Sequence, residues 1–320
     1  MVSYKDFKLI LPNQDQLEKI SDLIENKNGS LFHEVTLNNI IKKTFNTQLF
    51  YLVDNPIDIK TCAPIHVTKN KYGLKTYHFK PLYDIPYAGF VGNEDIEINK
   101  ISIGLFESLE YKGFPFEIKN NQNLNNSGVG ETTMVDLFKD EDILFNKVIH
   151  SKRRNMIRKA LKSGITVKCF WTLDGLEQFW PILEELHKKL GYTHLTFDYY
   201  NRILENYGKK KQAFILLAFK DEKPISGVFI IGNNNYMHYF KGASVFGIKN
   251  EGQGELLQWE AIKLSKSLGS RYYDLCNLDE KKLPEIYRFK TGISKEIYQY
   301  PIYTKTSLSY KIINRLSKFL

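Results

Sequence analysis

The stretch that most constrains the fold is residues 251–292, EGQGELLQWEAIKLSKSLGSRYYDLCNLDEKKLPEIYRFKTG. Its first half carries apolar residues at helical spacing: Leu256, Leu257, Ala261, Leu264 and Leu268. That spacing predicts a helix with one face packed on a sheet, and Gly269 follows where a left-handed helix end favours glycine. Residues 271–276 then read as a buried strand that ends in Asp274 and Asn277. Polar groups at the end of a buried strand often belong to a site.

Length and composition indicate an ordinary globular protein with a basic balance. At 320 residues the chain is long enough for two domains. Hydrophobic residues make up 42% and charged residues 25%, which excludes a disordered chain. The formal net charge of +9 favours an anionic partner, such as nucleic acid, a nucleotide-linked substrate or a membrane surface.

Three sequence features bear on cellular location and metal binding. Cys62, Cys169 and Cys276 share no CxxC or Cys/His spacing, so we expect neither disulfides nor a zinc site. The N-terminal apolar run is short and interrupted by Lys8, which argues against a signal peptide. No apolar run approaches the roughly 20 residues that cross a bilayer. We therefore expect a cytoplasmic protein that binds no metal.

Hydrophobic periodicity predicts alternating helices and strands along the whole chain. The expected helices are 15–25, 37–45, 95–112, 173–190 and 198–206. The expected strands are 7–11, 48–53, 61–68, 114–118, 131–137, 165–170, 212–219, 224–231 and 235–243. Tight polar turns join the last three strands, which predicts antiparallel hairpins.

The aromatic segment 76–91, TYHFKPLYDIPYAGFV, contains proline or glycine every few residues. This composition predicts an extended or looped wall. Tyr87 is a candidate substrate-binding residue in that wall. The alternative is a buried loop held by aromatic packing.

Residues 147–162 form the most strongly charged region of the chain. They contain seven basic residues and no acid: Lys147, Lys152, Arg153, Arg154, Arg158, Lys159 and Lys162. Basic side chains on one helical face suit phosphate contacts, so Arg153, Arg154 and Arg158 are candidate substrate-binding residues. The alternative is a solvated basic helix that links two halves of the chain.

The two halves of the chain share an order of elements. LFYLVDNPIDIKTCAPIHV parallels FILLAFKDEKPISGVFIIG, and GLFESLEYKGFPFEIK parallels WEAIKLSKSLGSRYYDLC. Two copies of one α/β unit agree with the length. The predicted domains are 1–145 and 146–304, followed by a C-terminal amphipathic helix, 305–320.

The C-terminal helix separates apolar from basic residues. Its apolar residues are Ile312, Ile313, Leu316, Phe319 and Leu320, and its basic residues are Lys311, Arg315 and Lys318. A basic amphipathic helix suits the surface of an anionic membrane. Packing on the surface of the protein itself is the alternative.

Four segments together resemble the FemABX-type branch of the GNAT acyltransferase superfamily: SKRRNMIRKALKSGITV, YFKGAS, LLQWEAIKLSKSLGSRYYDL and YRFKTGI. The resemblance covers most of residues 30–303 and is strongest from 151 to 300. It implies an α/β fold of two tandem GNAT-like domains, each a mixed, mostly antiparallel sheet flanked by helices. It also implies transfer of an acyl group to an amine. In the peptidoglycan branch the donor is aminoacyl-tRNA and the acceptor is a lipid-linked or nucleotide-linked muropeptide.

Two motifs connect this resemblance to particular residues. Phe289-Lys290-Thr291-Gly292 matches an FKxG motif whose lysine helps to hold the donor ester or its leaving group, and this role carries over to Lys290. Residues 249–254, KNEGQG, nearly match the pyrophosphate loop of acetyl-CoA-dependent members, with lysine in place of glutamine or arginine. Such a loop would direct the backbone N–H groups near Gly252 and Gly254 at phosphates. A flexible loop is the alternative.

Amide formation requires an acceptor for the amine proton and donors for the oxyanion. The sequence shows no Ser-His-Asp or Cys-His arrangement, so direct attack on the donor is the simpler mechanism. Lys290 can neutralise developing negative charge, while Asp274 or His238 could accept the proton. As alternatives, Asp274 caps a turn and His238 is a packed strand residue.

Three further residues are candidates for substrate binding. Arg288 can bind a carboxylate or phosphate with two nitrogens, although it could instead pair with Glu285. Tyr239 and Lys241 are two residues apart in one strand, so we expect them to share a face and line the acceptor groove.

These observations predict an N-acyltransferase that acts on a cell-wall or surface-polysaccharide precursor. The donor is aminoacyl-tRNA or acyl-CoA, and no tightly bound cofactor is expected. One alternative is an acyl-CoA-dependent GNAT enzyme acting on a sugar amine or another small amine. The other is a nucleic-acid-binding protein that uses residues 147–162. The expected location is the cytoplasm, with contact to the inner face of the membrane through residues 305–320 if that helix does not pack on the protein.

Overall fold

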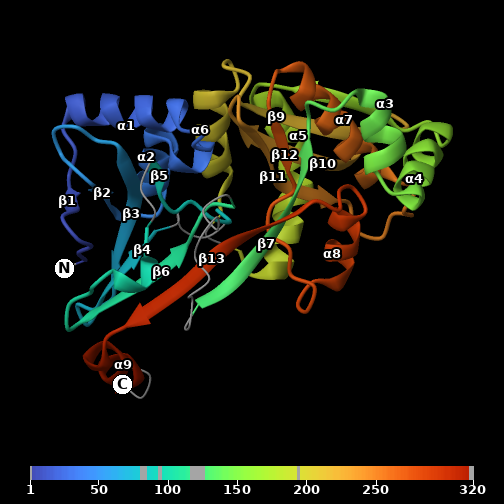
Figure 1. Cartoon of the computed structure of the whole chain (residues 1–320). Helices are drawn as coiled ribbons and strands as arrows, with labels where there is room; N and C mark the ends of the chain where they lie inside the picture. Colours follow the sequence, from blue (N-terminus) through green and yellow to red (C-terminus); the bar gives the residue numbers. More distant parts are fainter. Residues whose placement is uncertain (1, 80–84, 93–95, 116–126, 193–194, 317–320) are drawn as a thin grey trace. The chain divides into compact units, whose positions relative to one another are not determined.

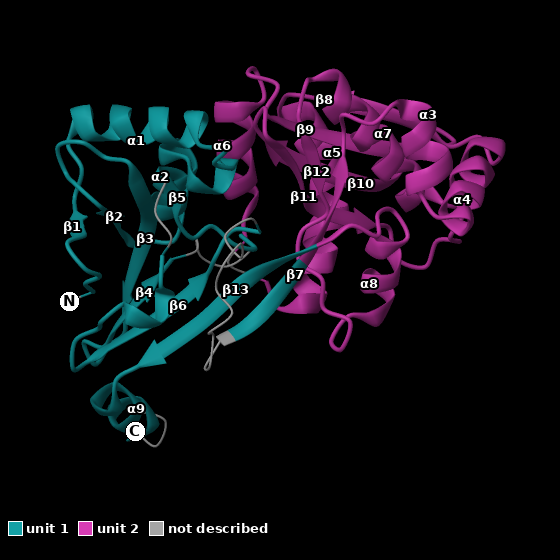
Figure 2. Cartoon of the chain, viewed as in Figure 1, with its two compact units in different colours: residues 1–131, 298–320 teal, residues 132–297 magenta. Residues whose placement is uncertain are grey.

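The computed structural model describes residues 2–79, 85–92, 96–115, 127–192 and 195–316 (Figure 1). The chain divides into two compact units, shown in Figure 2. Unit 1 comprises residues 1–131 and 298–320, and unit 2 comprises residues 132–297. The domain boundaries predicted from the sequence stay predictions, and by contacts residues 298–320 belong with unit 1.

Unit 1 contains a mixed sheet in the order β1-β2-β3-β4-β6-β13. The strands are β1 (Lys8–Ile10), β2 (Gln48–Val53), β3 (Thr61–Lys69), β4 (Lys75–His78), β6 (Glu107–Lys112) and β13 (Ile297–Thr306), with β5 (Val91–Gly92) paired to β3. In the part of unit 1 that the structure describes, β4 and β6 run parallel and the other pairs are antiparallel. Strand β13 thus belongs to this sheet although it is distant in sequence, because residues 302–306 of β13 pair with residues 108–112 of β6.

The helices of unit 1 are α1 (Gln14–Asn26), α2 (Val35–Thr44) and α9 (Leu308–Leu316), with 3-10 turns at Leu31–His33 and Ile98–Lys100. Asn13 and Gln16 form a reciprocal capping box that fixes the start of α1. Ile20 and Ile24 of α1 pack on Tyr51, so α1 covers one face of the sheet. A second, aromatic-rich core lies on the alternate residues of the strands.

Unit 2 contains a sheet in the order β7-β12-β11-β10-β9-β8. The strands are β7 (Ser127–Asp136), whose end lies in this unit, β8 (Thr166–Phe170), β9 (Ala213–Lys220), β10 (Lys223–Gly232), β11 (Tyr236–Ser244) and β12 (Tyr272–Asp274). β11 and β12 run parallel and the other pairs are antiparallel, including the two predicted hairpins, which are confirmed.

Helices cover both faces of the unit 2 sheet. They are α3 (Glu141–Ile143), which continues into a π-helical turn at Leu144–Val148, α4 (Ser151–Lys162), α5 (Leu173–Leu190), α6 (Phe197–Tyr207), α7 (Gln253–Ser267) and α8 (Pro284–Thr291). Ile157 of α4 and Leu257 of α7 share a core with Leu216 of β9. On the opposite face, Tyr200 of α6 packs against the ring of Phe229 in β10. The predicted helix and strand of residues 256–276 therefore lie where the periodicity placed them.

A β-bulge in β11 separates two residues that were expected to share a face. Tyr239 pairs with Ile230, and Lys241 pairs with Phe229, so Phe240 is the extra residue. Paired residues project to the same face of a sheet. Tyr239 therefore faces α7 and Lys241 faces α5 and α6. The expected shared face is wrong, because one inserted residue reverses the alternation.

The predicted helix at residues 95–112 is also wrong. The described part of this segment contains the turn at Ile98–Lys100 and strand β6. Leu109 and Tyr111 are buried at alternate positions, which is the period of a strand. In the second pair of segments proposed as a repeat, residues 104–119 contain strand β6, whereas residues 259–276 begin within the helix α7. These two segments therefore do not share a structure. Most of the predicted strand 114–118 lies outside the described residues.

The other predicted elements are confirmed, with ends that differ by a few residues. The fold class is confirmed as well, since each unit is a mixed sheet flanked by helices. Among the described helices, none has the length and apolarity that crossing a membrane requires.

Candidate active site

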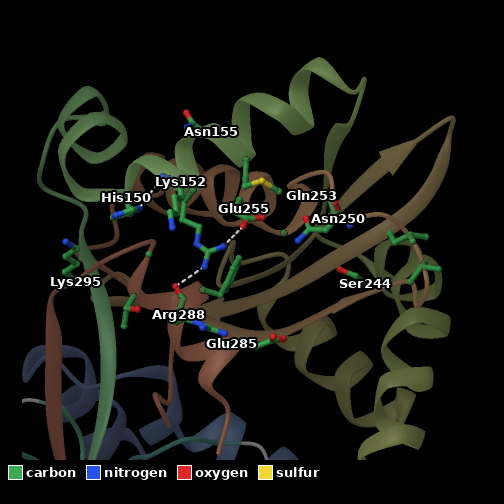
Figure 3. Close-up of a pocket in the computed structure, with 18 residues that line it drawn as sticks. His150, Lys152, Asn155, Ser244, Asn250, Gln253, Glu255, Glu285, Arg288 and Lys295 are labelled. Atoms are coloured by element: carbon green, nitrogen blue, oxygen red, sulfur yellow. Dashed lines mark hydrogen bonds and ion pairs between the residues drawn. The ribbon is translucent and has the colours of Figure 1, made fainter. Parts of the chain in front are cut away.

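A pocket of about 1110 Å³ lies in unit 2 between the first turns of α4 and α7 and the side of α8 (Figure 3). The titratable side chains that line it are mostly basic: His150, Lys152, Arg153, Arg288 and Lys295, with Glu255 and Glu285. Its volume reaches the upper end of the range for small-molecule sites. The pocket therefore suits an anionic ligand of at least nucleotide size.

Arg153 joins the three helices that form this pocket. Its Nη1 donates to Glu255 Oε1 at 2.7 Å and its Nη2 donates to the backbone oxygen of Arg288 at 2.9 Å, as Figure 3 shows. The guanidinium also lies 5.3 Å from the centroid of the Phe289 ring. A Cβ at Gly292 would lie 2.7 Å from Arg153 Nε, so glycine leaves the arginine its place. The close approach of Arg153 therefore explains why the last position of the FKxG motif is a glycine.

The other two arginines predicted to bind phosphate are turned away from this pocket. Arg154 donates to the backbone oxygens of Asn146 at 2.8 Å and Ile149 at 2.7 Å. Arg158 donates to Asn155 Oδ1 at 3.2 Å and lies over the Phe145 ring. The basic run was correctly predicted as a helix, but these side chains hold that helix to its neighbours.

Five titratable residues of the pocket were not predicted as site residues: His150, Lys152, Glu255, Glu285 and Lys295. Glu255 carried a usable signal, because an acid in the first turn of a helix interacts favourably with the helix dipole. It is also almost completely buried, which an acid tolerates only with a partner such as Arg153. His150 and Lys295 carried none, because they lie in short connections far apart in the sequence.

The loop of residues 249–254 is tied down on several sides. Asn250 Oδ1 accepts from the N–H of Gly252 at 3.0 Å, and Gln253 Oε1 accepts from the N–H of Glu251 at 2.9 Å. Lys159 Nζ donates to the backbone oxygen of Asn250 at 2.9 Å. These contacts argue against the flexible-loop alternative. The first N–H groups of α7 lack intrahelical acceptors, and Gly254 among them lines the pocket.

The two glycines predicted to bind the donor differ in whether the surrounding structure leaves room for a side chain. Gly252 has a φ of +94°, and a Cβ there would lie 2.1 Å from the backbone oxygen of Met156. Gly254 is helical, and a Cβ there would make an ordinary contact 3.8 Å from the Phe289 ring. Packing therefore requires glycine at the first position and permits a side chain at the second.

We predict opposite effects of alanine at these two glycines. Gly252→Ala should lower the free energy of unfolding by about 2 kcal/mol or more, because it combines left-handed strain with a backbone clash. Gly254→Ala should raise it by about 0.5–1 kcal/mol, because alanine favours a helix. Urea unfolding of both variants measures the difference. Equal effects of the two substitutions would contradict this assignment.

A buried hydrogen-bond network surrounds Asp274 at the end of β12. Its Oδ2 lies 2.7 Å from His238 Nδ1, and its Oδ1 accepts from Thr132 Oγ1 at 2.6 Å and from the N–H of Cys276 at 2.9 Å. The side chains of His238 and Asp274 are completely inaccessible to solvent. The structure therefore brings two predicted catalytic residues together, and the turn-capping alternative for Asp274 is realised at the same time.

Thr132 and Cys276 are the members of this network that the sequence analysis did not assign. Thr132 projects to the Asp274 side of the sheet because it lies two residues before Met134, which pairs with Asp274. The alternation of the predicted strand 131–137 indicated which residues share a face with Thr132. It did not indicate that Asp274 lies next to Thr132. Cys276 follows β12 directly, and burial raises the pKa of its thiol. The thiol is therefore a poor nucleophile.

His238, Asp274 and Cys276 have ligand atoms within 4.8 Å of one another, which is close enough to consider a metal ion. His238 and Asp274 already hydrogen-bond directly, and further donors from Thr132 and Cys276 reach the carboxylate of Asp274. This arrangement describes a satisfied network rather than an open donor set. The prediction that the protein binds no metal stays a prediction.

Lys290 lies beside this network on the buried side of α8. Its Nζ donates to the backbone oxygens of Cys276 at 2.6 Å and Asn277 at 3.0 Å, and lies 5.7 Å from the Tyr239 ring centroid. Cys276 and Asn277 have positive φ angles of 56° and 25°, which residues other than glycine seldom adopt. The ammonium group therefore holds a strained turn, and burial lowers the pKa of Lys290.

Helix α8 separates Lys290 from the pocket. Phe289 and Thr291 line the pocket, whereas Lys290 projects toward Asp274, whose charge affects its pKa. Arg288 lines the pocket, as its predicted role requires. Tyr239 lies near Lys290, while Lys241 projects from the other face of β11.

Tyr87 lies in unit 1 and is completely buried. Its ring packs against Phe32, Phe114 and Tyr300, with centroid distances of 5.8, 5.7 and 4.9 Å. This environment is the aromatic packing that was the alternative to a substrate-binding role.

The free energy of unfolding should depend on pH through Asp274. Burial raises the pKa of its carboxyl group from 3.8 to about 7, so the folded state retains a proton that the unfolded state loses in this interval. This contribution is complete below pH 3.8 and is lost as the pH rises toward 7. Relative to Asp274→Asn, the wild type should lose up to about 1.4 kcal/mol per pH unit there. Denaturant unfolding across the interval measures this difference, and a constant difference would contradict the raised pKa.

Comparison with known proteins finds one matching family model and several similar solved structures. The model of the FemAB family matches residues 78–223. Over this range the chain is similar to the FemAB family. No curated protein sequence matches it.

Among solved structures, FemX superposes with a TM-score of 0.68 at 12% sequence identity, over 96% of this chain and 99% of FemX. L-PGS from Bacillus licheniformis gives 0.52 at 14% identity, over 94% of this chain and 95% of L-PGS. A tandem GNAT protein from the clavulanic acid biosynthesis pathway gives 0.51 at 10% identity, over 96% of this chain and 98% of that protein. At these identities the similarity shows the fold, a FemAB-like tandem GNAT fold, over nearly the whole chain.

Proposed function

We propose that this FemAB-like chain is an N-acyltransferase that transfers an aminoacyl or acyl group to an amine of a cell-wall or surface-polysaccharide precursor. The observation that carries the proposal is the position of α8. One side of this helix lines a cationic pocket, and the other side buries Lys290 beside the Asp274–His238 pair. The FemAB family match and the similarity to FemX support the reaction class.

The unit 2 pocket is the proposed donor site. Aminoacyl-tRNA and acyl-CoA both carry phosphates on an adenosine, so one cationic pocket can accept either donor. Lys152 and Arg288 would contact the phosphates of the donor. The backbone N–H groups at the start of α7 would donate further hydrogen bonds to these phosphates. The glutamate at the same helix start, Glu255, is neutralised by Arg153 and does not oppose the donor.

The proposed reaction is direct attack of the amine on the donor carbonyl. A C–N bond forms, the C–O bond of an ester or the C–S bond of a thioester breaks, and the amine loses a proton. Asp274 is suited to accept that proton near neutral pH, because its pKa is about 7. His238 and Thr132 hold the carboxylate in one orientation. Because Asp274 is buried and Lys290 lies on the far side of α8 from the pocket, the reaction requires the reactive end of the donor to reach past α8 to its buried side. Lys290 then supplies positive charge for the oxyanion.

A transfer assay tests the proposal. Purified protein is incubated with aminoacyl-tRNA or acetyl-CoA and a panel of muropeptide precursors, nucleotide sugars and amino sugars. We expect an amide product by mass spectrometry with one donor, accompanied by deacylated tRNA or free thiol. Absence of product with both donors, together with steeply salt-dependent binding to generic RNA, would favour the nucleic-acid alternative.

In this assay, Lys290→Met should lower the transfer rate by about 10²- to 10³-fold, which is typical for loss of one oxyanion donor. Lys282→Met is the matched control, because Lys282 is highly exposed and lies near the start of α8. Because Lys290 also holds the turn at residues 276 and 277, thermal unfolding with and without donor accompanies the rates. A folded, donor-binding Lys290→Met variant with full activity would contradict the role of this lysine.

A further inference from the structure

Three segments of unit 1 that are distant in sequence meet beside α9. They are the turn of residues 69–76 between β3 and β4, the loop of residues 103–106 before β6, and residues 305–316, which include α9. The N–H of Lys75 donates to the backbone oxygen of Phe106 at 3.2 Å, which joins the first two segments. Ser307 Oγ donates to the backbone oxygen of Leu105, which joins the third. We call these segments together the α9 surface; α9 itself is labelled at the C-terminal end of the chain in Figure 1.

Among the described residues, the hydrogen bond of helix α9 with the sheet comes from one side of the helix. Tyr310 on this side lies with its hydroxyl 3.0 Å from Thr76 Oγ1, and Ile313 is half-buried. No residue of α9 is fully buried. One side of α9 therefore packs on the protein itself, as one of the two alternatives for this helix predicted, and the other side is exposed.

The α9 surface exposes a group of large apolar side chains. Five of them are between 51% and 74% exposed: Leu105, Phe106, Leu308, Ile312 and Leu316. Leu308, Ile312 and Leu316 follow at intervals of four along α9, so they form one stripe. Grouped exposed apolar side chains on a folded protein mark an interaction surface.

The charges of the α9 surface have a single sign. The three segments contain six basic residues and no aspartate or glutamate: Lys69, Lys71, Lys75, Lys305, Lys311 and Arg315. All of these except Lys305 are exposed. The adjoining Glu107 is buried and accepts from the hydroxyl of Tyr77 and the N–H of Gly104, so it does not neutralise the surface.

We propose that the α9 surface docks on an anionic phospholipid bilayer. Exposed leucine, isoleucine and phenylalanine suit the acyl boundary of a bilayer, and exposed lysine and arginine of the same segments suit anionic headgroups. A nucleic acid would use the cations but not the apolar stripe. The proposal is independent of the acyl-transfer function, because it uses no residue of the unit 2 pocket or network.

Vesicle flotation tests this proposal with the full-length protein. The vesicles contain either phosphatidylcholine alone or equal parts of phosphatidylcholine and phosphatidylglycerol. We expect binding to the anionic vesicles only. Lys311→Glu with Arg315→Glu should weaken this binding by about 10-fold or more. Leu308→Ser with Ile312→Ser should leave residual binding that disappears at high salt, because only screened electrostatic attraction remains.

The matched control is Lys209→Glu with Lys223→Glu, which changes the net charge equally at exposed positions of unit 2. This control should bind anionic vesicles like the wild type. Equal weakening in the control, equal binding of the wild type to both vesicle types, or no binding to either would overturn the proposal. A dimer that the Leu308→Ser/Ile312→Ser variant dissociates would overturn it too, because that result assigns the surface to a second copy of the chain. Circular dichroism verifies that each variant is folded.

Discussion

The ion pair between Arg153 and Glu255 is the contact on which the rest of the candidate site depends. Glu255 is almost completely buried in the first turn of α7, and it is stable there because the guanidinium neutralises it. The same guanidinium reaches the backbone of α8 through the oxygen of Arg288. One side chain from α4 thus fixes the relative position of three helices. The pocket is the space that they leave between them.

The buried network beneath α8 depends on the short length of β12. This strand pairs with β11 over only three residues and ends at Asp274, while β11 continues to Ser244. The chain leaves the sheet through two left-handed residues, Cys276 and Asn277, whose carbonyls turn toward Lys290. A lysine can be buried here because these carbonyls replace water around its ammonium group. The strained turn at residues 276 and 277 is therefore held by both Lys290 and Asp274. Strained backbone of this kind is common at functional sites.

Much of unit 2 could be predicted from the sequence, because its signals are local. The apolar spacing of residues 256–268 defines α7, and polar turns between apolar runs define the hairpins of β9, β10 and β11. The bulge at Phe240 could not be predicted, since it depends on pairing with β10. The directions of Arg154 and Arg158 depend on the π-helical turn beside α4, and this turn has no signal in the sequence.

The candidate site shows the same division between local and long-range information. Asp274 was identified from its place at the end of a predicted strand and Lys290 from the FKxG motif, and the structure places both in one buried cluster. Thr132 joins them across 142 residues of sequence, which no local pattern reveals. In unit 1, the period of two in residues 107–112 was misread as a helix because charged residues interrupt the apolar ones. The contribution of β13 to the sheet of unit 1 is likewise a long-range pairing.

In the proposed mechanism the unit 2 pocket holds the acyl donor beside α8. The most direct measurement is a crystal structure of the full-length protein with coenzyme A, and another with a stable analogue of the aminoacylated end of tRNA. If the pocket is the donor site, one of these ligands will occupy it, with phosphate oxygens within hydrogen-bond distance of Lys152 or Arg288. A ligand bound elsewhere, with this pocket empty, would contradict the account.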